Sequence, residues 1–186
     1  MKITFPNILS ISRLVISIFF VVLFISNDLI LQFIALILFI LGSITDYFDG
    51  YIARKYNLTS DLGKFLDPLA DKFFTISAFF SFVLLNIIPL WMLLILIGRD
   101  LILTILRTIN INLITTSFEA KLKTTLQMIF IIITIIMVLI INSFPNSMLS
   151  TYFNLFLYSI YYDLIMFFIV ILTIWSFLKY IIKTFK

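Results

Sequence analysis

Four aspartates stand in two closely spaced pairs, and their spacing is the first sign of chemistry in this chain. Asp46 and Asp49 are three residues apart, and Asp67 and Asp71 are four residues apart. On helices, side chains at these spacings share one face and lie about 5–6 Å apart, where like charges repel. A cation between the carboxylates of each pair would relieve that repulsion. The pattern therefore predicts a metal site.

The residue types restrict the metals that such a site could hold. The chain has 186 residues and contains no histidine and no cysteine, so it offers no imidazole ligand, thiolate ligand or disulfide. Carboxylate oxygens suit hard cations such as Mg²⁺, Mn²⁺ or Ca²⁺. Four carboxylates could hold two ions, and two divalent ions about 3.5–4 Å apart can assist a displacement at phosphorus.

The surroundings of the aspartates allow a simpler interpretation, a solvated hairpin rich in charges. Both pairs, however, border apolar stretches, where a carboxylate is unfavourable unless it meets a metal, a partner or water. Gly50 and Ala53 leave the helix backbone open to a bulky ligand, although small residues also pack helices against each other in membranes. Arg54 offers a planar fork of donors that fits phosphate oxygens.

Apolar helices must position these residues. Hydrophobic residues make up 63% of the chain and charged residues 12%, against roughly half and a quarter in soluble domains, so the excess should face lipid. A membrane-spanning helix needs about 20 mostly apolar residues. We predict an all-α, polytopic membrane protein with a single domain, residues 1–186, and six transmembrane helices at 9–27, 29–48, 69–87, 88–110, 122–142 and 163–182.

The positions of lysine and arginine predict the topology. The connections 27–28, 86–89 and 142–162 contain none of the 13 basic residues. Because basic residues favour the cytoplasmic side, both termini and the link 55–66 between the aspartate pairs are expected in the cytoplasm. The first span lacks a small-x-small cleavage pattern and is expected to be retained. A net charge of +4 in so apolar a chain indicates membrane topology or an anionic lipid or phosphate substrate, and no nucleic acid.

A second group of charges lies in the later helices. Arg99 and Arg107 are eight residues apart, about 80° around a helix, and Lys121 begins the next span. Three cations that can face one cavity favour an anionic ligand such as a phosphate. Snorkelling to lipid headgroups is the alternative for Lys121 and Lys123. For Arg99, in the middle of its span, the alternative is an ion pair with Asp100 or another helix.

The aspartate segment resembles the signature of the CDP-alcohol phosphatidyltransferases without a gap. The matching residues are Asp46-x-x-Asp49-Gly50-x-x-Ala53-Arg54, then eight residues, then Gly63-x-x-x-Asp67-x-x-x-Asp71. Eight specified positions at fixed spacing make a chance match rare. The resemblance implies a six-helix membrane enzyme whose aspartates bind two divalent ions, Mg²⁺ or Mn²⁺, which hold the pyrophosphate of a CDP-linked lipid. It also implies that Asp71 is the general base, and that the nucleotide is bound by Gly50, Ala53, Arg54 and Gly63.

Other segments resemble the bacterial-type phosphatidylglycerophosphate synthase branch of this family. They are Pro6-Asn7 with Ser10 and Arg13, Gly98-Arg99-Asp100 with Leu106-Arg107, and Lys121 to Met128. Asp100 stands where the branch usually has glutamate, and Ala120 where a glycine is common. The resemblance implies that a phosphatidyl group passes from CDP-diacylglycerol to sn-glycerol 3-phosphate, giving phosphatidylglycerophosphate and CMP. It places Arg99, Arg107 and Lys121 on the acceptor phosphate, in a homodimer of the bacterial cytoplasmic membrane with its site facing the cytoplasm.

Two other functions are compatible with the same residues. A sister enzyme of this fold, such as a cardiolipin synthase that uses phosphatidylglycerol, would share every aspartate but would not consume glycerol 3-phosphate. An ion-coupled transporter also needs charges inside the membrane. A transporter would distribute its carboxylates across the bilayer, often within inverted repeats, whereas the aspartates here lie on one predicted side.

Overall fold

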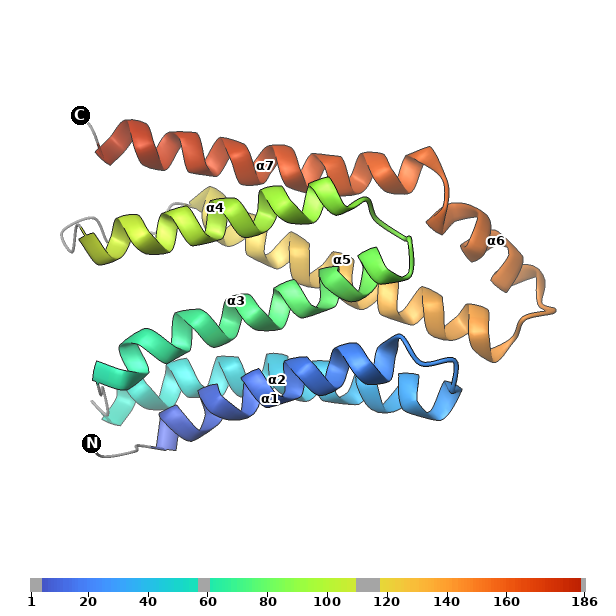
Figure 1. Cartoon of the computed structure of the whole chain (residues 1–186), viewed down its shortest axis with the longest axis horizontal. Helices are drawn as coiled ribbons and strands as arrows, with labels where there is room; N and C mark the ends of the chain where they lie inside the picture. The colour runs from blue at the N-terminus through green and yellow to red at the C-terminus, as the bar shows by residue number, and fades with distance from the viewer. Residues whose placement is uncertain (1–4, 57–60, 110–117, 185–186) are drawn as a thin grey trace. The chain divides into compact units, whose positions relative to one another are not determined.

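The computed structural model describes residues 5–56, 61–109 and 118–184, and the side chains of residues 8–45, 69–104, 106 and 122–182. All regular structure in these ranges is helical, as predicted. The helices are α1 (Phe5–Phe24), α2 (Leu29–Tyr56), α3 (Asp61–Leu84), α4 (Leu90–Ile109), α5 (Phe118–Ser143), α6 (Met148–Leu157) and α7 (Ile160–Thr184). They form two compact units, Met1–Leu84 with α1 to α3 and Leu85–Lys186 with α4 to α7 (Figure 1).

Helices α2 and α3 are longer than the apolar stretches predicted within them. The predicted span 29–48 ends, and the predicted span 69–87 begins, among charged residues, but α2 continues to Tyr56 and α3 begins at Asp61. Apolar stretches end where charged residues become frequent, whereas a helix continues as long as its backbone hydrogen bonds do. Both aspartate pairs therefore lie on helices, and the predicted link 55–66 includes residues of both helices.

Aromatic rings form the core of the first unit, where α1 packs against both α2 and α3. Phe20 and Phe24 of α1 stack with ring centroids 5.3 Å apart, and Phe20 also meets Phe39 of α2 at 5.3 Å. Phe39 in turn stacks on Phe74 of α3, with centroids 4.6 Å apart and planes 13° apart. These rings join the three helices of the first unit.

The ring of Phe74 on α3 lies against the backbone of α2 at Gly42, which has no side chain. A Cβ atom built at Gly42 would lie 2.6 Å from two ring atoms of Phe74. That distance is well inside van der Waals contact, and the ring cannot easily move because it is stacked on Phe39. Gly42 is therefore a packing residue that allows the Phe74 ring to fill this space.

We expect Gly42→Ala to lower the free energy of unfolding by about 1–3 kcal/mol, the usual cost of overpacking a core. Gly98→Ala is the matched control, because no atom among the described residues lies within 4 Å of a Cβ built there. Alanine has the higher helix propensity, by about 1 kcal/mol, so this variant should be as stable as the parent or more stable. Thermal unfolding in one detergent compares them, and equal midpoints for both variants would contradict the close packing.

The turn between α1 and α2 is held by polar side chains. Asp28 caps α2, since its Oδ1 accepts a hydrogen bond from the backbone N–H of Ile30 at 2.8 Å. The hydroxyl of Ser26 accepts from the backbone N–H of Asp28 at 3.0 Å, and the side-chain amide of Gln32 donates to the carbonyl of Ser26 at 2.7 Å. Asp28 thus has a local structural role that does not involve the other aspartates.

In the second unit, α7 packs against α4 and α5, and the short α6 packs against α5 and α7. Tyr162 of α7 is buried, and its hydroxyl lies 2.7 Å from the hydroxyl of Thr134 on α5. Its ring meets Phe130 of α5 at 5.0 Å and Phe156 of α6 at 5.9 Å. This tyrosine connects three helices of the unit with a satisfied hydrogen bond in an apolar setting.

Helix α6 was not predicted, because 142–162 was interpreted as a connection between two spans. Ser147 caps this helix by accepting a hydrogen bond from the backbone N–H of Ser150 at 3.0 Å. The ten residues that follow the cap contain no glycine or proline, so nothing interrupts a helix of this length. The segment is too short to span a bilayer, and a search for spans of about 20 residues overlooks it.

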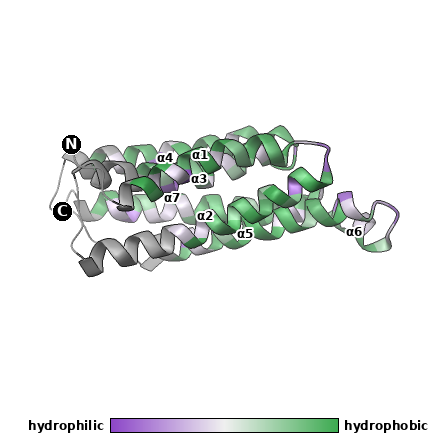
Figure 2. Ribbon diagram, turned by 90° about the horizontal axis from the view of Figure 1, so that it is seen from below, coloured by the Kyte–Doolittle hydropathy of each residue, from purple (hydrophilic) through white to green (hydrophobic). Residues whose placement is uncertain are grey.

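Most residues of the described helices are hydrophobic (Figure 2), and many of their apolar side chains are exposed. Ile18, Ile30 and Trp175 are 66%, 69% and 56% exposed, and many other large apolar side chains are exposed in the same way. Of the described residues, two stretches are long and apolar enough to cross a membrane, Leu122–Ser143 and Ile160–Ile182, while Ile8–Phe24 and Leu29–Thr45 are shorter. Exposed apolar surface of this extent is unusual in a water-soluble monomer and marks contact with lipid or another partner.

Candidate functional site

The eight residues of the aspartate motif are divided between two helices of the first unit. Helix α2 carries Asp46, Asp49, Gly50, Ala53 and Arg54, and helix α3 carries Gly63, Asp67 and Asp71. Asp71 is the one member whose side chain lies within the described residues. Among the side chains that are described, no group of three or more carboxylate, imidazole or thiolate ligands occurs. The other three aspartates lie outside that set, so their convergence on metal ions stays a prediction.

Asp71 is held by a buried arginine on a neighbouring helix. Arg13 of α1 is 1% exposed, and its Nη1 donates a charge-assisted hydrogen bond to Oδ1 of Asp71, which is 48% exposed. A buried guanidinium needs an anionic partner, because an uncompensated charge in an apolar interior is very unfavourable. The close packing of α1 on α3 brings the two side chains together. The carboxylate is therefore anchored on one oxygen while the residue stays accessible.

The second unit contains a cluster of charges that joins three of its helices. Asp100 of α4 accepts hydrogen bonds on Oδ1 from Nη1 of Arg99 at 2.7 Å and from Nζ of Lys123 on α5 at 3.0 Å. Arg99 also donates from Nη2 to the hydroxyl of Ser176 on α7 at 2.9 Å. Arg99, Asp100 and Lys123 are 13%, 15% and 3% exposed. We call these four residues, Arg99, Asp100, Lys123 and Ser176, the Asp100 cluster.

The Asp100 cluster carries an excess of positive charge. Two cations meet one carboxylate, so these residues together hold one net positive charge in a largely buried position. The Nε of Arg99 is also buried, and no described residue accepts its hydrogen. A buried guanidinium whose Nε–H donor has no described acceptor is suited to an anion with several oxygens, such as a phosphate.

Comparison with known proteins identifies the family of this chain. A sequence model described as CDP-alcohol phosphatidyltransferase matches residues 3–178. The chain belongs to the CDP-alcohol phosphatidyltransferase family. The matched region covers both structural units. It therefore includes the helices of the Asp100 cluster as well as those of the aspartate motif.

Several curated proteins are similar to this chain, and the three that follow each bear the name CDP-diacylglycerol–glycerol-3-phosphate 3-phosphatidyltransferase. The protein from Bacillus subtilis is 42% identical over 96 residues, which are 50% of this chain and 50% of that protein. The protein from Rickettsia typhi is 49% identical over 67 residues, 36% of this chain and 38% of that protein. The protein from Wigglesworthia glossinidia brevipalpis is 38% identical over 143 residues, 70% of this chain and 76% of that protein.

The burial of Lys123 corrects the interpretation of this residue as a headgroup-binding lysine. Snorkelling to headgroups would require an exposed ammonium group, but Lys123 is 3% exposed. It begins the buried face of α5, which continues through Gln127, Phe130 and Thr134 at helical intervals. That periodicity was present in the sequence and could have identified Lys123 as an inward-facing cation.

The three predicted phosphate ligands are only partly described. Arg99 makes the ion pair with Asp100 that was the competing interpretation. This pair does not exclude a phosphate, because a guanidinium group has five donor hydrogens and the described contacts of Arg99 use two of them. Arg107 and Lys121 lie on α4 and α5, but their side chains are outside the described residues.

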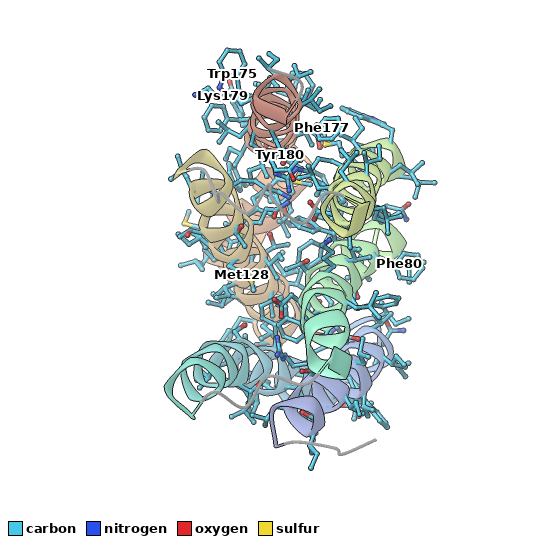
Figure 3. The ribbon with its side chains drawn as sticks, turned by 90° about the vertical axis from the view of Figure 1, so that its left-hand side faces the viewer. Phe80, Met128, Trp175, Phe177, Lys179 and Tyr180 are labelled. Atoms are coloured by element: carbon cyan, nitrogen blue, oxygen red, sulfur yellow. The ribbon has the colours of Figure 1, made fainter. Side chains whose placement is uncertain are left out.

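Ser176 is a residue that the sequence interpretation missed, because 163–182 was considered only as an apolar span. It lies on a polar stripe of α7 with Thr173 and Tyr180, three residues before it and four after it. Figure 3 shows Tyr180 on the side of α7 toward α4 and α5, while Trp175 and Lys179 lie on its outer side. A search for polar residues at helical spacing could have found this stripe.

Proposed function

We propose that this chain transfers a phosphatidyl group from CDP-diacylglycerol to sn-glycerol 3-phosphate, giving phosphatidylglycerophosphate and CMP. Several curated relatives bear the name of this reaction. The observation that carries the proposal is the Wigglesworthia protein, which matches 70% of the chain at 38% identity. The complete aspartate motif on α2 and α3 and the Asp100 cluster in the second unit support it, because the reaction needs a metal-bound pyrophosphate and a phosphate-bearing acceptor.

In this proposal the aspartate motif binds the activated lipid. Asp46, Asp49, Asp67 and Asp71 would hold two divalent ions, Mg²⁺ or Mn²⁺, and a ligand set made only of carboxylates fits such hard cations. When bound, the ions would neutralise charge on the pyrophosphate. Gly50 and Ala53 would let the cytidine diphosphate approach the backbone of α2, and Gly63 would let it approach α3. Arg54 would donate hydrogen bonds to the phosphate oxygens of the nucleotide.

Asp71 has the second role of general base. The acceptor hydroxyl would give its proton to the Asp71 carboxylate as its oxygen bonds to the lipid-side phosphorus. The bond from that phosphorus to the oxygen of CMP breaks, and CMP leaves with the electron pair. Positioned general bases contribute about 10²–10⁴-fold to rate. The hydrogen bond from Arg13 supports this role, because a carboxylate anchored on one oxygen keeps a fixed orientation toward the acceptor.

The acceptor phosphate would be bound in the second unit by Arg99, Arg107 and Lys121. The net positive charge of the Asp100 cluster and the spare donor on Arg99 support this assignment. A neutral acceptor alcohol, such as glycerol or inositol, would bring no phosphate to these cations. The charge of the second unit therefore favours glycerol 3-phosphate over a neutral alcohol.

The location proposed for this enzyme is the bacterial cytoplasmic membrane. The apolar surfaces of the described helices support six spans in one domain, residues 1–186, and the distribution of basic residues favours cytoplasmic termini. The aspartate motif would then face the cytoplasm, where CDP-diacylglycerol presents its nucleotide. A homodimer is the proposed assembly, as the family resemblance implies.

An assay with several acceptors tests the reaction and its cofactor. We expect purified protein in detergent with CDP-diacylglycerol and Mg²⁺ or Mn²⁺ to release CMP when glycerol 3-phosphate is added, but not with phosphatidylglycerol, glycerol or inositol. A chelator should abolish turnover, and an excess of either metal ion should restore it. Consumption of phosphatidylglycerol would assign the sister reaction instead, and chelator-resistant turnover would contradict the metal site.

A further inference from the structure

The hydroxyl of Ser176 makes two hydrogen bonds that give it a defined direction. It donates its one hydrogen to the backbone carbonyl of Thr173 at 3.0 Å. The hydrogen bond from Nη2 of Arg99 must therefore be accepted by a lone pair of the same oxygen. Ser176 is 2% exposed, so water does not compete for these positions. The serine acts as a fixed, buried acceptor for one nitrogen of the Arg99 guanidinium.

The other side of the guanidinium is held by Asp100, and Asp100 is held by a second helix. Nη1 of Arg99 donates to Oδ1 of Asp100, and the same oxygen accepts from Nζ of Lys123. The guanidinium plane is consequently anchored at two nitrogens. Asp100, itself bound by Lys123 of α5, holds Nη1, and Ser176 of α7 holds Nη2. Its Nε, by contrast, is buried and has no acceptor among the described residues. A guanidinium fixed at two nitrogens presents its third nitrogen in one direction.

We infer that Ser176 is a positioning residue for the acceptor, holding Arg99 in the orientation in which it binds the phosphate of glycerol 3-phosphate. This inference rests on the proposed function, because it assigns the ligand of Arg99 to the acceptor phosphate. A phosphate group accepts two parallel N–H hydrogen bonds from a correctly oriented arginine. The affinity for phosphate therefore depends on the orientation of the guanidinium plane and not only on its charge. The C-terminal helix thereby contributes to acceptor selection without touching the acceptor.

A purely structural role for the hydroxyl makes a different prediction. Serine and threonine hydroxyls in helices often bond only to a carbonyl in the preceding turn. Thr173, three residues earlier on the same buried face, does this, since its hydroxyl donates to the carbonyl of Ile169 at 2.7 Å. The two hydroxyls are thus similar in burial and in backbone bonding, and of the two Ser176 is the one with a described hydrogen bond to Arg99.

The first test is the kinetics of Ser176→Ala. Loss of one hydrogen bond to a positioned cation should raise the KM for glycerol 3-phosphate by about three- to tenfold, while the KM for CDP-diacylglycerol and the kcat stay close to those of the parent. Ser176→Thr, which keeps a hydroxyl, should restore most of the affinity. Thr173→Val, which removes the neighbouring hydroxyl, should leave the KM for glycerol 3-phosphate unchanged. An equal effect of Thr173→Val and Ser176→Ala on this KM would overturn the inference.

A double-mutant cycle shows whether Ser176 acts through Arg99. Lysine in Arg99→Lys keeps the positive charge but cannot form the bidentate fork, so we expect a higher KM for glycerol 3-phosphate. In the Arg99→Lys background, Ser176→Ala should cause no further increase, because the group that it positions is already absent. Additive effects of the two substitutions would contradict a role through Arg99.

The controls separate failure of this inference from failure of the proposed function. If the parent protein does not consume glycerol 3-phosphate, the proposed function fails. If the parent consumes it but Arg99→Ala leaves its KM unchanged, the assignment of Arg99 to the acceptor fails. If Arg99→Ala raises this KM and Ser176→Ala does not, the positioning role alone fails. Inorganic phosphate offers a readout without turnover, because it should raise the unfolding temperature of the parent more than that of Ser176→Ala.

Discussion

Asp71→Asn is expected to reduce turnover by at least about 100-fold, because asparagine cannot accept the proton of the acceptor hydroxyl. The substitution also removes a proposed metal ligand, so the loss should exceed that of a general base alone. The amide oxygen of asparagine can still accept the hydrogen bond that Arg13 makes to Oδ1. The helical fold should therefore survive, with some loss of stability from the unbalanced charge of Arg13. CMP release and circular dichroism on the same detergent sample measure the two effects.

Asp28→Asn is the matched control for this experiment. It makes the same chemical change in the same unit, at an exposed residue that caps α2 and has no place in the aspartate motif. Asparagine caps helices as well as aspartate, so stability and turnover should both stay near those of the parent. Turnover of Asp71→Asn within threefold of the Asp28→Asn variant would exclude Asp71 as the general base.

Asp100→Ala is expected to lower the free energy of unfolding by about 3–5 kcal/mol, the usual cost of removing one partner from a buried ion pair. Asp100 accepts from both Arg99 and Lys123, so its removal leaves two buried cations next to each other without their carboxylate. Asp100→Glu should be tolerated, because it restores the carboxylate that is usual at this position in the branch that the sequence resembles. Thermal unfolding in detergent, compared among the three proteins, measures the difference.

A double variant tests whether the loss in Asp100→Ala comes from charge. Lys123→Met removes one of the two cations and keeps a long apolar side chain that fits a buried face. In the Asp100→Ala background, Lys123→Met should recover part of the lost stability, with a coupling energy of about 0.5–3 kcal/mol. If Lys123→Met destabilises the parent and the Asp100→Ala variant equally, the two side chains do not interact as described.

Both units of this protein place a buried basic side chain against an aspartate from another helix. Arg13 meets Asp71 in the first unit, and Lys123 meets Asp100 in the second. Buried ion pairs of this kind contribute little to stability relative to apolar packing, so their presence calls for another explanation. In our proposal each pair orients a charged group that acts on a substrate.

The family and the helical class could be predicted from the sequence because both depend on short intervals along the chain. The eight residues of the aspartate motif occur at fixed spacing between Asp46 and Asp71, and apolar stretches of about 20 residues are visible without any knowledge of contacts. The limits of the helices were less predictable. Helix α2 continues to Tyr56 through charged residues, and α6 is shorter than a span.

The partners of the buried charges could not be predicted in the same way. Arg13 and Asp71 are 58 residues apart, Asp100 and Lys123 are 23 apart, and Arg99 and Ser176 are 77 apart. Which of many polar groups meet across such separations depends on how the helices pack, such as α1 against α3 and α4 against α7. Local periodicity determines which face a residue occupies, but only the packed helices determine which side chain stands opposite it.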